Sequence, residues 1–335
     1  MATKEAKKKR REPTSILLSK RANAFYIEQA RIMQKDGRLL FLTRGGDEIE
    51  KFFNIPHKNT SFLLLGTGTS ITSSAARLLA ESGVMTGFVG SGGSPLQIAV
   101  DPVFMTPVSE YRPTEYFQAW MRIWLDEDRR LSLAKRFMKI RLDWVKQAWR
   151  KNVCLSEMGI VISEDDSSWF HSAIEKSATT EDLLSSEAVW ARRLYGKLKD
   201  GFGVKKFKRD PGVWNPKHTT KTEQKKSGKD PEVLSNSFLD HGNYIAYGYA
   251  AVALYALGIS FALPVLHGKT RRGALVFDVA DLFKDAIVMP LAFEYGSVQE
   301  KDQQFRNELI RRCLKAEVID NLIDTIKKCI IEETQ

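Results

Sequence analysis

The sequence predicts an α+β fold: a β-rich N-terminal domain with one short helix, followed by a larger all-helical domain. Two observations carry this prediction. Over the first hundred residues, short apolar runs alternate with turn residues, which is typical of strands. Beyond residue 116, apolar residues recur three or four positions apart with arginine and lysine between them, which is typical of amphipathic helices.

The N-terminal domain is expected to span residues 21–110, after a basic disordered tail over residues 1–20. Its helix is predicted over residues 71–82, where apolar residues have helical spacing and Gly83 follows as a stop signal. The strands are expected at residues 37–42, 51–56, 61–66, 84–90 and 96–100. Two prolines in a polar stretch at residues 106–116 place the domain boundary there.

The helical domain is expected to span residues 111–335. Its tryptophans, such as Trp120 and Trp124, fall at helical spacing and are expected in the core. Residues 243–266 carry no charge and are long enough to span a bilayer. Because four tyrosines, two glycines and Pro264 dilute the apolar character, we expect a buried helix there and no membrane segment.

The charge balance favours an anionic partner. Lysine and arginine number 51 against 41 acidic residues, which gives a net charge of +10. Nucleic acid and an acidic membrane surface both fit. The basic stretch at residues 205–229 is expected to be a flexible insertion, either solvated or in contact with DNA phosphates. Three separated cysteines exclude a disulfide framework and a CxxC zinc site, so a cytoplasmic location is expected.

Two aspartates in an apolar segment are the first candidates for chemistry. Asp278 and Asp281 lie three residues apart, so one helical face presents both carboxylates. A buried carboxylate is costly unless it is paired with a cation. The partners could be basic residues in the preceding turn, which would form a structural salt bridge, or a metal ion. The sequence leaves both open.

His267 and Glu187 complete a possible ligand set. Glu187 is expected near the beginning of a helix over residues 185–198, and His267 at the end of the uncharged helix. With Asp281 they offer two carboxylates and one imidazole, which suit Mg²⁺ or Mn²⁺. Such a site promotes phosphoryl transfer, with water or a DNA 3′-hydroxyl as the nucleophile.

Several segments together resemble the CRISPR-associated adaptation integrase, most closely that of subtype I-F. The resemblance covers most of the chain. The segments that carry it are SSEAVWARRLYGKL (residues 185–198), LDHGNYIAYGYAAVALYALG (239–258), LPVLHG (263–268), VFDVADLF (276–283) and, in the N-terminal domain, SFLLLGTGTSITSSAARLLAESGV (61–84).

This resemblance implies a homodimer formed through the β-rich domain and a catalytic helical domain. It implies that Glu187, His267 and Asp281 hold the divalent cation and that Asp278 supports the site. It further implies insertion of foreign DNA segments (spacers) into the CRISPR array, with double-stranded and branched DNA as substrates. The implied partner is a small adaptation protein, which in subtype I-F is fused to the helicase-nuclease.

Basic residues that flank the acidic ligands in the sequence are candidates for DNA-phosphate contact, although surface arginines often form only weak salt bridges. They are Arg192, Arg193, Lys205, Lys206, Lys208, Arg209, Lys269, Arg271 and Arg272.

Two other functions compete with the integrase. A nucleotide-dependent enzyme is suggested by GTGTS at residues 66–70, but the third glycine of the dinucleotide-binding fingerprint is missing. A non-catalytic nucleic-acid-binding scaffold would explain the basic charge and would use the histidine and aspartates only as core pairs.

Overall fold

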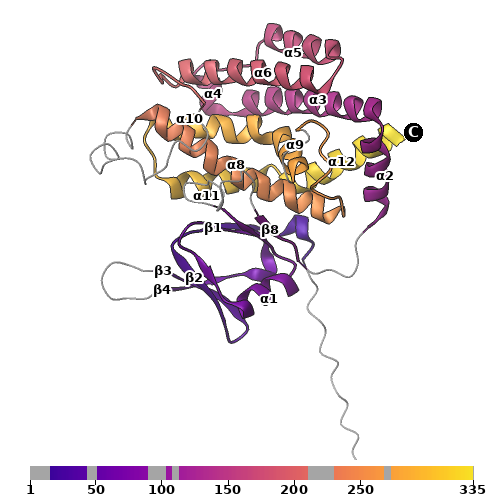
Figure 1. Ribbon diagram of the computed structural model, residues 1–335. Helices are drawn as coiled ribbons and strands as arrows, with labels where there is room; N and C mark the ends of the chain where they lie inside the picture. The colour runs from indigo at the N-terminus through magenta and orange to yellow at the C-terminus, as the bar shows by residue number, and fades with distance from the viewer. Residues whose placement is uncertain are drawn as a thin grey trace, which may run out of the picture.

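The computed structural model describes residues 16–43, 51–89, 103–107, 113–209, 230–267 and 273–334. A β-rich N-terminal part lies against one side of a larger helical part (Figure 1). The predicted α+β class is therefore confirmed. The strand expected at residues 96–100 lies outside the described residues, as do the first fifteen residues of the expected tail.

The described strands form two four-stranded sheets. The first sheet has the order β1 (Asn23–Ile27), β5 (Thr60–Leu65), β7 (Met85–Phe88) and β8 (Val103–Met105), with β8 antiparallel to β7 and the other neighbours parallel. The second has the order β4 (Lys51–Ile55), β3 (Arg38–Thr43), β2 (Ala30–Lys35) and β6 (Ser70–Ile71). Helix α1 (Ser73–Glu81) leads from β6 to β7.

Strands β1 and β2, and the short strands β6 and β8, were not predicted from the sequence. The signal for β2 is the pair Asp36 and Gly37, which forms a two-residue turn with Lys35 opposite Arg38. Both turn residues have positive φ, 51° and 71°, as such a hairpin turn requires. The Asp-Gly pair between two apolar runs therefore predicts a hairpin of β2 and β3, whereas the first strand had been expected only at residues 37–42.

Strand β5 joins the two parts of the molecule. Its residues alternate between two cores: Leu63 and Leu65 face the second sheet and α1, while Phe62 and Leu64 belong to the core shared with the helices. Phe62 packs edge-on against Tyr249, with ring centroids 5.0 Å apart. The β-rich part is thus fixed to the helical part through a continuous apolar contact.

The glycines of the GTGTS segment (residues 66–70), which resembles part of a dinucleotide-binding motif, are explained by the fold. A side chain at Gly66 would place its Cβ 2.9 Å from the Tyr26 hydroxyl oxygen, and Gly68 has a φ of +72°. Both glycines are therefore accounted for by local packing and backbone conformation.

The helical part is built around the long central helix α8 (Pro231–Ala256), most of whose residues are buried. The other helices are α2 (Glu115–Leu125), α3 (Glu127–Lys151), α4 (Val153–Glu157), α5 (Glu164–Lys176), α6 (Thr180–Gly201), α9 (Ala274–Phe283), a π-helix (Lys284–Val288), α10 (Met289–Ser297), α11 (Asp302–Lys315) and α12 (Val318–Thr334). Within the described part of the chain, no helix combines the length and apolar character that a bilayer crossing requires.

Two expected helix limits were wrong. The helix that carries Glu187 begins at Thr180, because Thr179 and Asp182 form a capping box that fixes its first turn. The uncharged helix ends at Ala256, where Gly258 with a φ of +68° reverses the chain. His267 therefore lies in the loop after α8 and does not close the helix.

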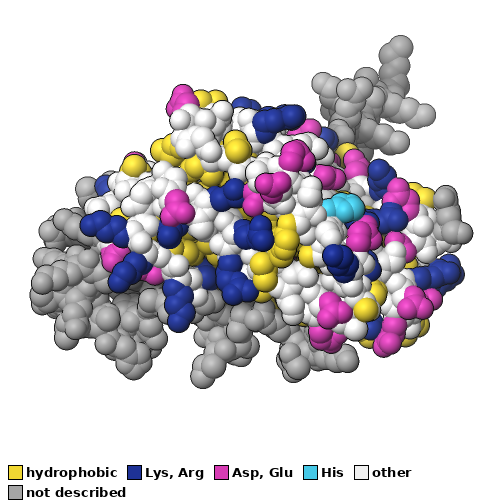
Figure 2. All heavy atoms as spheres, turned by 90° about the horizontal axis from the view of Figure 1, so that it is seen from above, with side chains coloured by type: hydrophobic (Ala, Val, Ile, Leu, Met, Phe, Trp, Pro, Cys, Tyr) yellow, Lys and Arg dark blue, Asp and Glu magenta, His cyan; other side chains and the backbone are white. Residues whose placement is uncertain are grey.

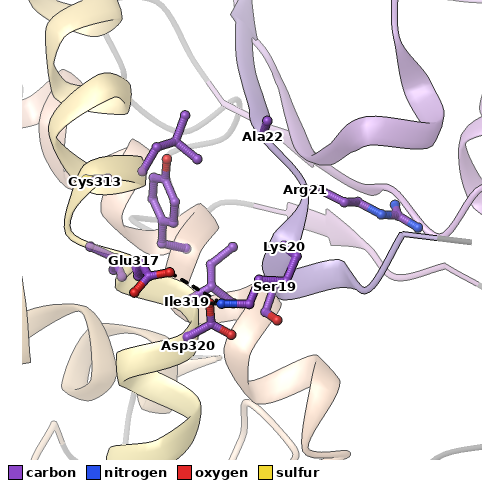
Figure 3. A pocket seen from close by; sticks show the side chains of 11 residues that line it. Ser19, Lys20, Arg21, Ala22, Cys313, Glu317, Ile319 and Asp320 are labelled. Carbon is purple, nitrogen blue, oxygen red and sulfur yellow. Dashed lines mark hydrogen bonds and ion pairs between the residues drawn. The ribbon is translucent and has the colours of Figure 1, made fainter.

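The expected N-terminal tail is folded at its end. Leu18–Lys20 forms a 3-10 turn, and Lys20 lies beside Glu317 and Asp320 at the start of α12 (Figure 3). Arg21 is buried and donates to the carbonyl oxygens of Thr60 and Gly83, at 2.9 and 3.1 Å. The prediction of disorder was thus wrong for residues 16–20.

The beginning of the basic insertion is also ordered. Phe207 packs between Tyr195 and Phe293, with ring centroids 5.1 and 4.6 Å away. The guanidinium of Arg209 pairs with Asp240 of α8 at 2.5 Å. Residues 205–209 are therefore attached to the helical part, contrary to the expected flexibility, and residues 210–229 lie outside the described residues.

Candidate metal centre

The site lies where α6, α9 and the loop after α8 meet. Glu187 comes from α6, Asp278 and Asp281 from α9, and His267 from the loop. Ligand atoms of Glu187, His267 and Asp281 all lie within 4.8 Å of one another. The structure thus brings together the three residues that the sequence analysis assigned to a metal, although they are far apart in the chain.

Asp278 fixes the loop that carries His267. Its carboxylate accepts hydrogen bonds from the backbone N–H groups of Val265, Leu266 and His267, at 2.7, 3.1 and 2.9 Å. The same carboxylate contacts His267 Nδ1 at 2.7 Å. The imidazole is thereby oriented with Nε2 toward Glu187, whose Oε2 lies 3.9 Å away.

Two tryptophans of α2 hold the loop from the other side. Trp120 Nε1 donates to the carbonyl oxygen of Leu263 at 3.0 Å, and Trp124 Nε1 donates to that of Pro264 at 2.9 Å. Trp120 is fully buried, as expected, and Trp124 is half-buried. These residues therefore position the loop as well as fill the core, a role that their spacing alone did not indicate.

Three further charged residues surround the ligands. Arg141 of α3 pairs with Glu187 Oε1 at 2.5 Å and with Asp285 Oδ2 at 2.6 Å. Lys284 forms an ion pair with Asp281. Arg141, Lys284 and Asp285 were not among the site residues predicted from the sequence. Arg141 gave a usable signal, because it lies on the otherwise apolar face of α3 that includes Met138.

The charges shift the protonation of the ligands. Burial lowers the pKa of His267, but the Asp278 hydrogen bond and the charges of Asp281, Asp278 and Glu187 outweigh it and raise that pKa to about 9. Burial raises the pKa of Asp281, but Lys284, Arg141 and His267 outweigh it and hold that pKa below its usual value. Asp281 is thus a carboxylate at neutral pH, the form in which it could bind a cation in exchange for Lys284.

The residue set fits a divalent cation. Two carboxylates and one imidazole are donors that Mg²⁺ and Mn²⁺ accept, and no thiolate belongs to this group of ligand atoms. The Nδ1–H group of His267 can donate to Asp278, so Nε2, once it has lost its proton, is the ring nitrogen that would bind a cation, the arrangement usual for metal-bound histidine.

The candidates for phosphate contact have different surroundings. Arg192 is exposed on α6, whereas Arg193 stacks on Trp169 at 4.0 Å and lies 3.6 Å from Asp166. Lys205, Lys206 and Lys208 are exposed, and Arg209 is held by Asp240. Lys269, Arg271 and Arg272 lie outside the described residues.

A groove of about 510 Å³ runs beside α6, the helix that carries Glu187. Small side chains form part of its wall: Ala188, Ala191 and Gly196. The charged residues that line it are all basic: Arg192, Lys199, Lys208 and Arg209. A groove with small residues and positive charge can accept a phosphate backbone at close approach.

Comparison with known proteins agrees with this geometry. The family model described as CRISPR associated protein Cas1 matches residues 25–328. The chain is 41% identical over 327 residues to the CRISPR-associated endonuclease Cas1 of Pseudomonas aeruginosa, with 94% of this chain and 95% of that protein covered. It is 38% identical over 323 residues to the corresponding protein of Pectobacterium atrosepticum, with 93% of each covered.

Solved structures share the fold. A CAS1 protein from Thermotoga maritima superposes with a TM-score of 0.70 at 13% identity, covering 93% of this chain and 96% of that one. A complex of TtCas1 with DNA gives 0.64 at 22% identity, covering 92% and 91%. A casposase bound to integration product gives 0.65 at 13% identity, covering 90% and 82%. The predicted family is confirmed, subtype I-F is consistent with the Pseudomonas relative, and the chain belongs to the CRISPR-associated Cas1 endonuclease family.

Proposed function

We propose that this protein is a divalent-metal-dependent DNA endonuclease and strand-transfer integrase that inserts spacers into the CRISPR array. The observation that carries the proposal is the convergence of Glu187, His267 and Asp281 from three separate segments to within 4.8 Å. Membership of a family whose relatives are named CRISPR-associated endonucleases supports the same activity.

Glu187, His267 and Asp281 would hold Mg²⁺ or Mn²⁺, with Asp278 orienting the imidazole. A cation bound there acts as a Lewis acid on a phosphodiester and stabilises the negative charge that develops during phosphoryl transfer. The protein contributes a fixed set of ligands, since the backbone bonds to Asp278 hold the loop of His267 in place. Attack by water cleaves DNA, and attack by a DNA 3′-hydroxyl joins two strands with loss of the original 3′-oxygen leaving group.

The groove beside α6 is the proposed path for the DNA backbone. On the face seen from above, basic and acidic side chains are interspersed (Figure 2), so this face as a whole does not identify a binding surface. The groove differs, because all the charged residues that line it are basic. It also lies along α6, the helix that carries Glu187. Arg192 and Lys208 are therefore proposed to contact phosphates, together with the exposed Lys205 and Lys206.

Arg193 and Arg209 are weaker candidates for phosphate contact than their neighbours. The side chain of Arg193 lies over Trp169 and near Asp166, and that of Arg209 pairs with Asp240. Each would have to give up these contacts to bind DNA. Their proposed role is to fix α5 against α6 and to attach the beginning of the insertion to α8.

We further propose a homodimer formed through the β-rich part and a cytoplasmic location. Double-stranded and branched DNA are the proposed substrates. The proposed protein partner is a small CRISPR adaptation protein, fused to the helicase-nuclease in subtype I-F. Support for DNA and for a Cas partner comes from solved structures with this fold, one a complex of TtCas1 with DNA and another a Cas6-RT-Cas1–Cas2 complex.

The non-catalytic scaffold remains a second candidate because of one observation. Lys284 and Arg141 already pair with Asp281 and Glu187, so these buried carboxylates have partners without a metal. Under this alternative, the acidic cluster would serve only the core.

The two candidates predict different results in one assay. Purified protein is incubated with branched DNA, or with short duplexes bearing 3′-hydroxyls and a plasmid that carries CRISPR repeats, in Mg²⁺ or Mn²⁺. We expect cleavage and strand joining that EDTA and Asp281→Ala each abolish, while DNA binding persists. Activity that survives EDTA contradicts metal dependence, and DNA binding without any cleavage or joining favours the scaffold.

A further inference from the structure

Arg141 is a buried arginine that sits behind the candidate metal ligands. It is 4% exposed and lies on the face of α3 that also buries Phe137, Met138 and Val145. A guanidinium in such surroundings is costly to bury unless its donors are satisfied. The buried position of Arg141 therefore requires specific partners for its guanidinium.

Both partners of Arg141 are carboxylates of the site region. Nη1 donates to Glu187 Oε1 at 2.5 Å, and Nε donates to Asp285 Oδ2 at 2.6 Å. The planar guanidinium makes the two contacts in a fixed relative geometry, which an ammonium group cannot do. Arg141 thus ties α6 to the π-helix through α3.

The far end of this link is itself held firmly. Asp285 lies in the π-helix Lys284–Val288, and its backbone carbonyl accepts a hydrogen bond from Trp149 Nε1 at 2.9 Å. Trp149 and Arg141 both belong to α3, so this helix holds Asp285 at its side chain and at its backbone. The π-turn directly follows α9, which carries Asp281, and π-turns are frequent at functional sites.

The contact with Arg141 leaves one oxygen of Glu187 available. Oε1 is engaged, while Oε2 lies 3.9 Å from His267 Nε2, on the side of the candidate metal centre. The space among Arg141, Leu266, Asp278 and Asp281 is only about 10 Å³, at the lower limit for one water molecule. Because Arg141 is buried and held by Asp285 as well, Glu187 cannot turn its Oε1 away without breaking the ion pair.

From this geometry we infer that Arg141 is a positioning residue, which holds the Glu187 carboxylate with one oxygen directed at the metal site. It touches neither the DNA nor the reacting atoms and acts only through Glu187. This inference rests on the proposed function, because it assigns Glu187 as a metal ligand. A purely structural role would instead make Arg141 important for folding and irrelevant to metal affinity.

A matched control separates these two roles. Arg306 of α11 is also buried and pairs with a glutamate, Glu28 at 3.1 Å, but at the junction with the β-rich part. The test measures the Mn²⁺ dissociation constant by electron paramagnetic resonance titration of the full-length metal-free protein. The variants are Arg141→Met, Arg141→Lys and Arg306→Met, and thermal unfolding is recorded for each.

We expect Arg141→Met to weaken Mn²⁺ binding by about 10- to 100-fold, as for other residues that orient metal ligands. Arg141→Lys should weaken it about tenfold, and Arg306→Met should leave it within twofold of wild type despite a lower melting temperature. If Arg141→Met does not fold, Arg141→Lys decides: affinity equal to wild type overturns the inference.

The outcomes also separate this inference from the proposed function. If the wild-type protein binds Mn²⁺ and Arg141→Met binds it within twofold, the positioning role is refuted and the metal site stands. If the wild-type protein binds no Mn²⁺ at saturating concentration, the proposed function fails and the positioning role fails with it.

Discussion

Replacing Asp278 by asparagine tests how the loop of His267 is held. The carboxylate accepts two backbone N–H groups on Oδ2 and the N–H of His267 on Oδ1, and its side chain is completely buried. An asparagine keeps one acceptor oxygen and presents an NH₂ group where the other oxygen was. If its oxygen accepts from Val265 and Leu266, the NH₂ faces the His267 N–H, and this donor loses its acceptor.

The magnitude follows from these contacts. A lost hydrogen bond to a charged acceptor costs about 1.5–3 kcal/mol, and a buried N–H without a partner costs about 1–3 kcal/mol, with some overlap between the two. We therefore expect Asp278→Asn to lower the free energy of unfolding by about 3 kcal/mol. For a chain of this size, that corresponds to a melting temperature lower by roughly 5–10 °C.

The same substitution should change the titration of His267. The Asp278 hydrogen bond is the largest of the contributions that raise the pKa of His267 to about 9. Without it, that pKa should fall toward its ordinary value near 6.5. In the wild type the raised pKa stabilises the fold below pH 6.5, and this contribution is lost as pH rises through about 9.

Urea unfolding and NMR titration of the labelled histidines, both on metal-free protein, measure these effects. Asp182→Asn is the control, because Asp182 also accepts backbone N–H groups, from Ala178 and Thr179 at 3.0 Å each, but is exposed. It should cost no more than about 1 kcal/mol. The reasoning is refuted if the free energy of unfolding of Asp278→Asn lies within 1 kcal/mol of that of the wild type and the pKa of His267 stays near 9.

Four further variants test other parts of the molecule. Because burial lowers the pKa of His241 to about 4, acidification from pH 6.5 to 4 should reduce the free energy of unfolding by up to about 3 kcal/mol. The variant His241→Leu should lose this part of the pH dependence. A pH profile of unfolding that is the same in His241→Leu and wild type contradicts the prediction. Gly248→Ala places a methyl group 2.6 Å from the Phe62 ring and should destabilise the protein by about 1–3 kcal/mol in denaturant titrations. Gly196 of α6 has open space around it, so Gly196→Ala should raise the free energy of unfolding by about 0.5–1 kcal/mol. If Gly248→Ala proves more stable than Gly196→Ala, the packing described around these glycines is contradicted. If Arg192 contacts a phosphate, Arg192→Gln should reduce the slope of log affinity for DNA against log salt by about one, and an unchanged slope removes Arg192 from the DNA path.

The fold class could be predicted from the sequence because it depends on local patterns, whereas the proposed ligand set also needed the resemblance to a known family, because its members come from separate segments. Asp278 and Asp281 stand out as charges in an apolar helix, and helical spacing alone places them on one face. The strand Ala30–Lys35 ends at the Asp36-Gly37 turn, a local pattern that is typical of a hairpin, whereas Asn23–Ile27 pairs with a strand distant in the sequence.

The surroundings of the site could not be predicted in the same way. The pairing of Arg141 with Glu187 joins residues 46 positions apart, and the hydrogen bond from Trp120 to Leu263 joins residues 143 positions apart. Such contacts depend on how α2, α3 and α6 pack around α8, and periodicity does not specify this packing. The same packing explains why Arg209 contacts Asp240, although its sequence neighbours suggested only a basic loop.

Anomalous diffraction from crystals of the protein grown with Mn²⁺ tests the central claim most directly. We expect one strong peak within bonding distance of the Glu187 carboxylate, the His267 imidazole and the Asp281 carboxylate, and loss of that peak in Asp281→Ala. A peak at other residues, or none among these three at saturating Mn²⁺, would contradict the account.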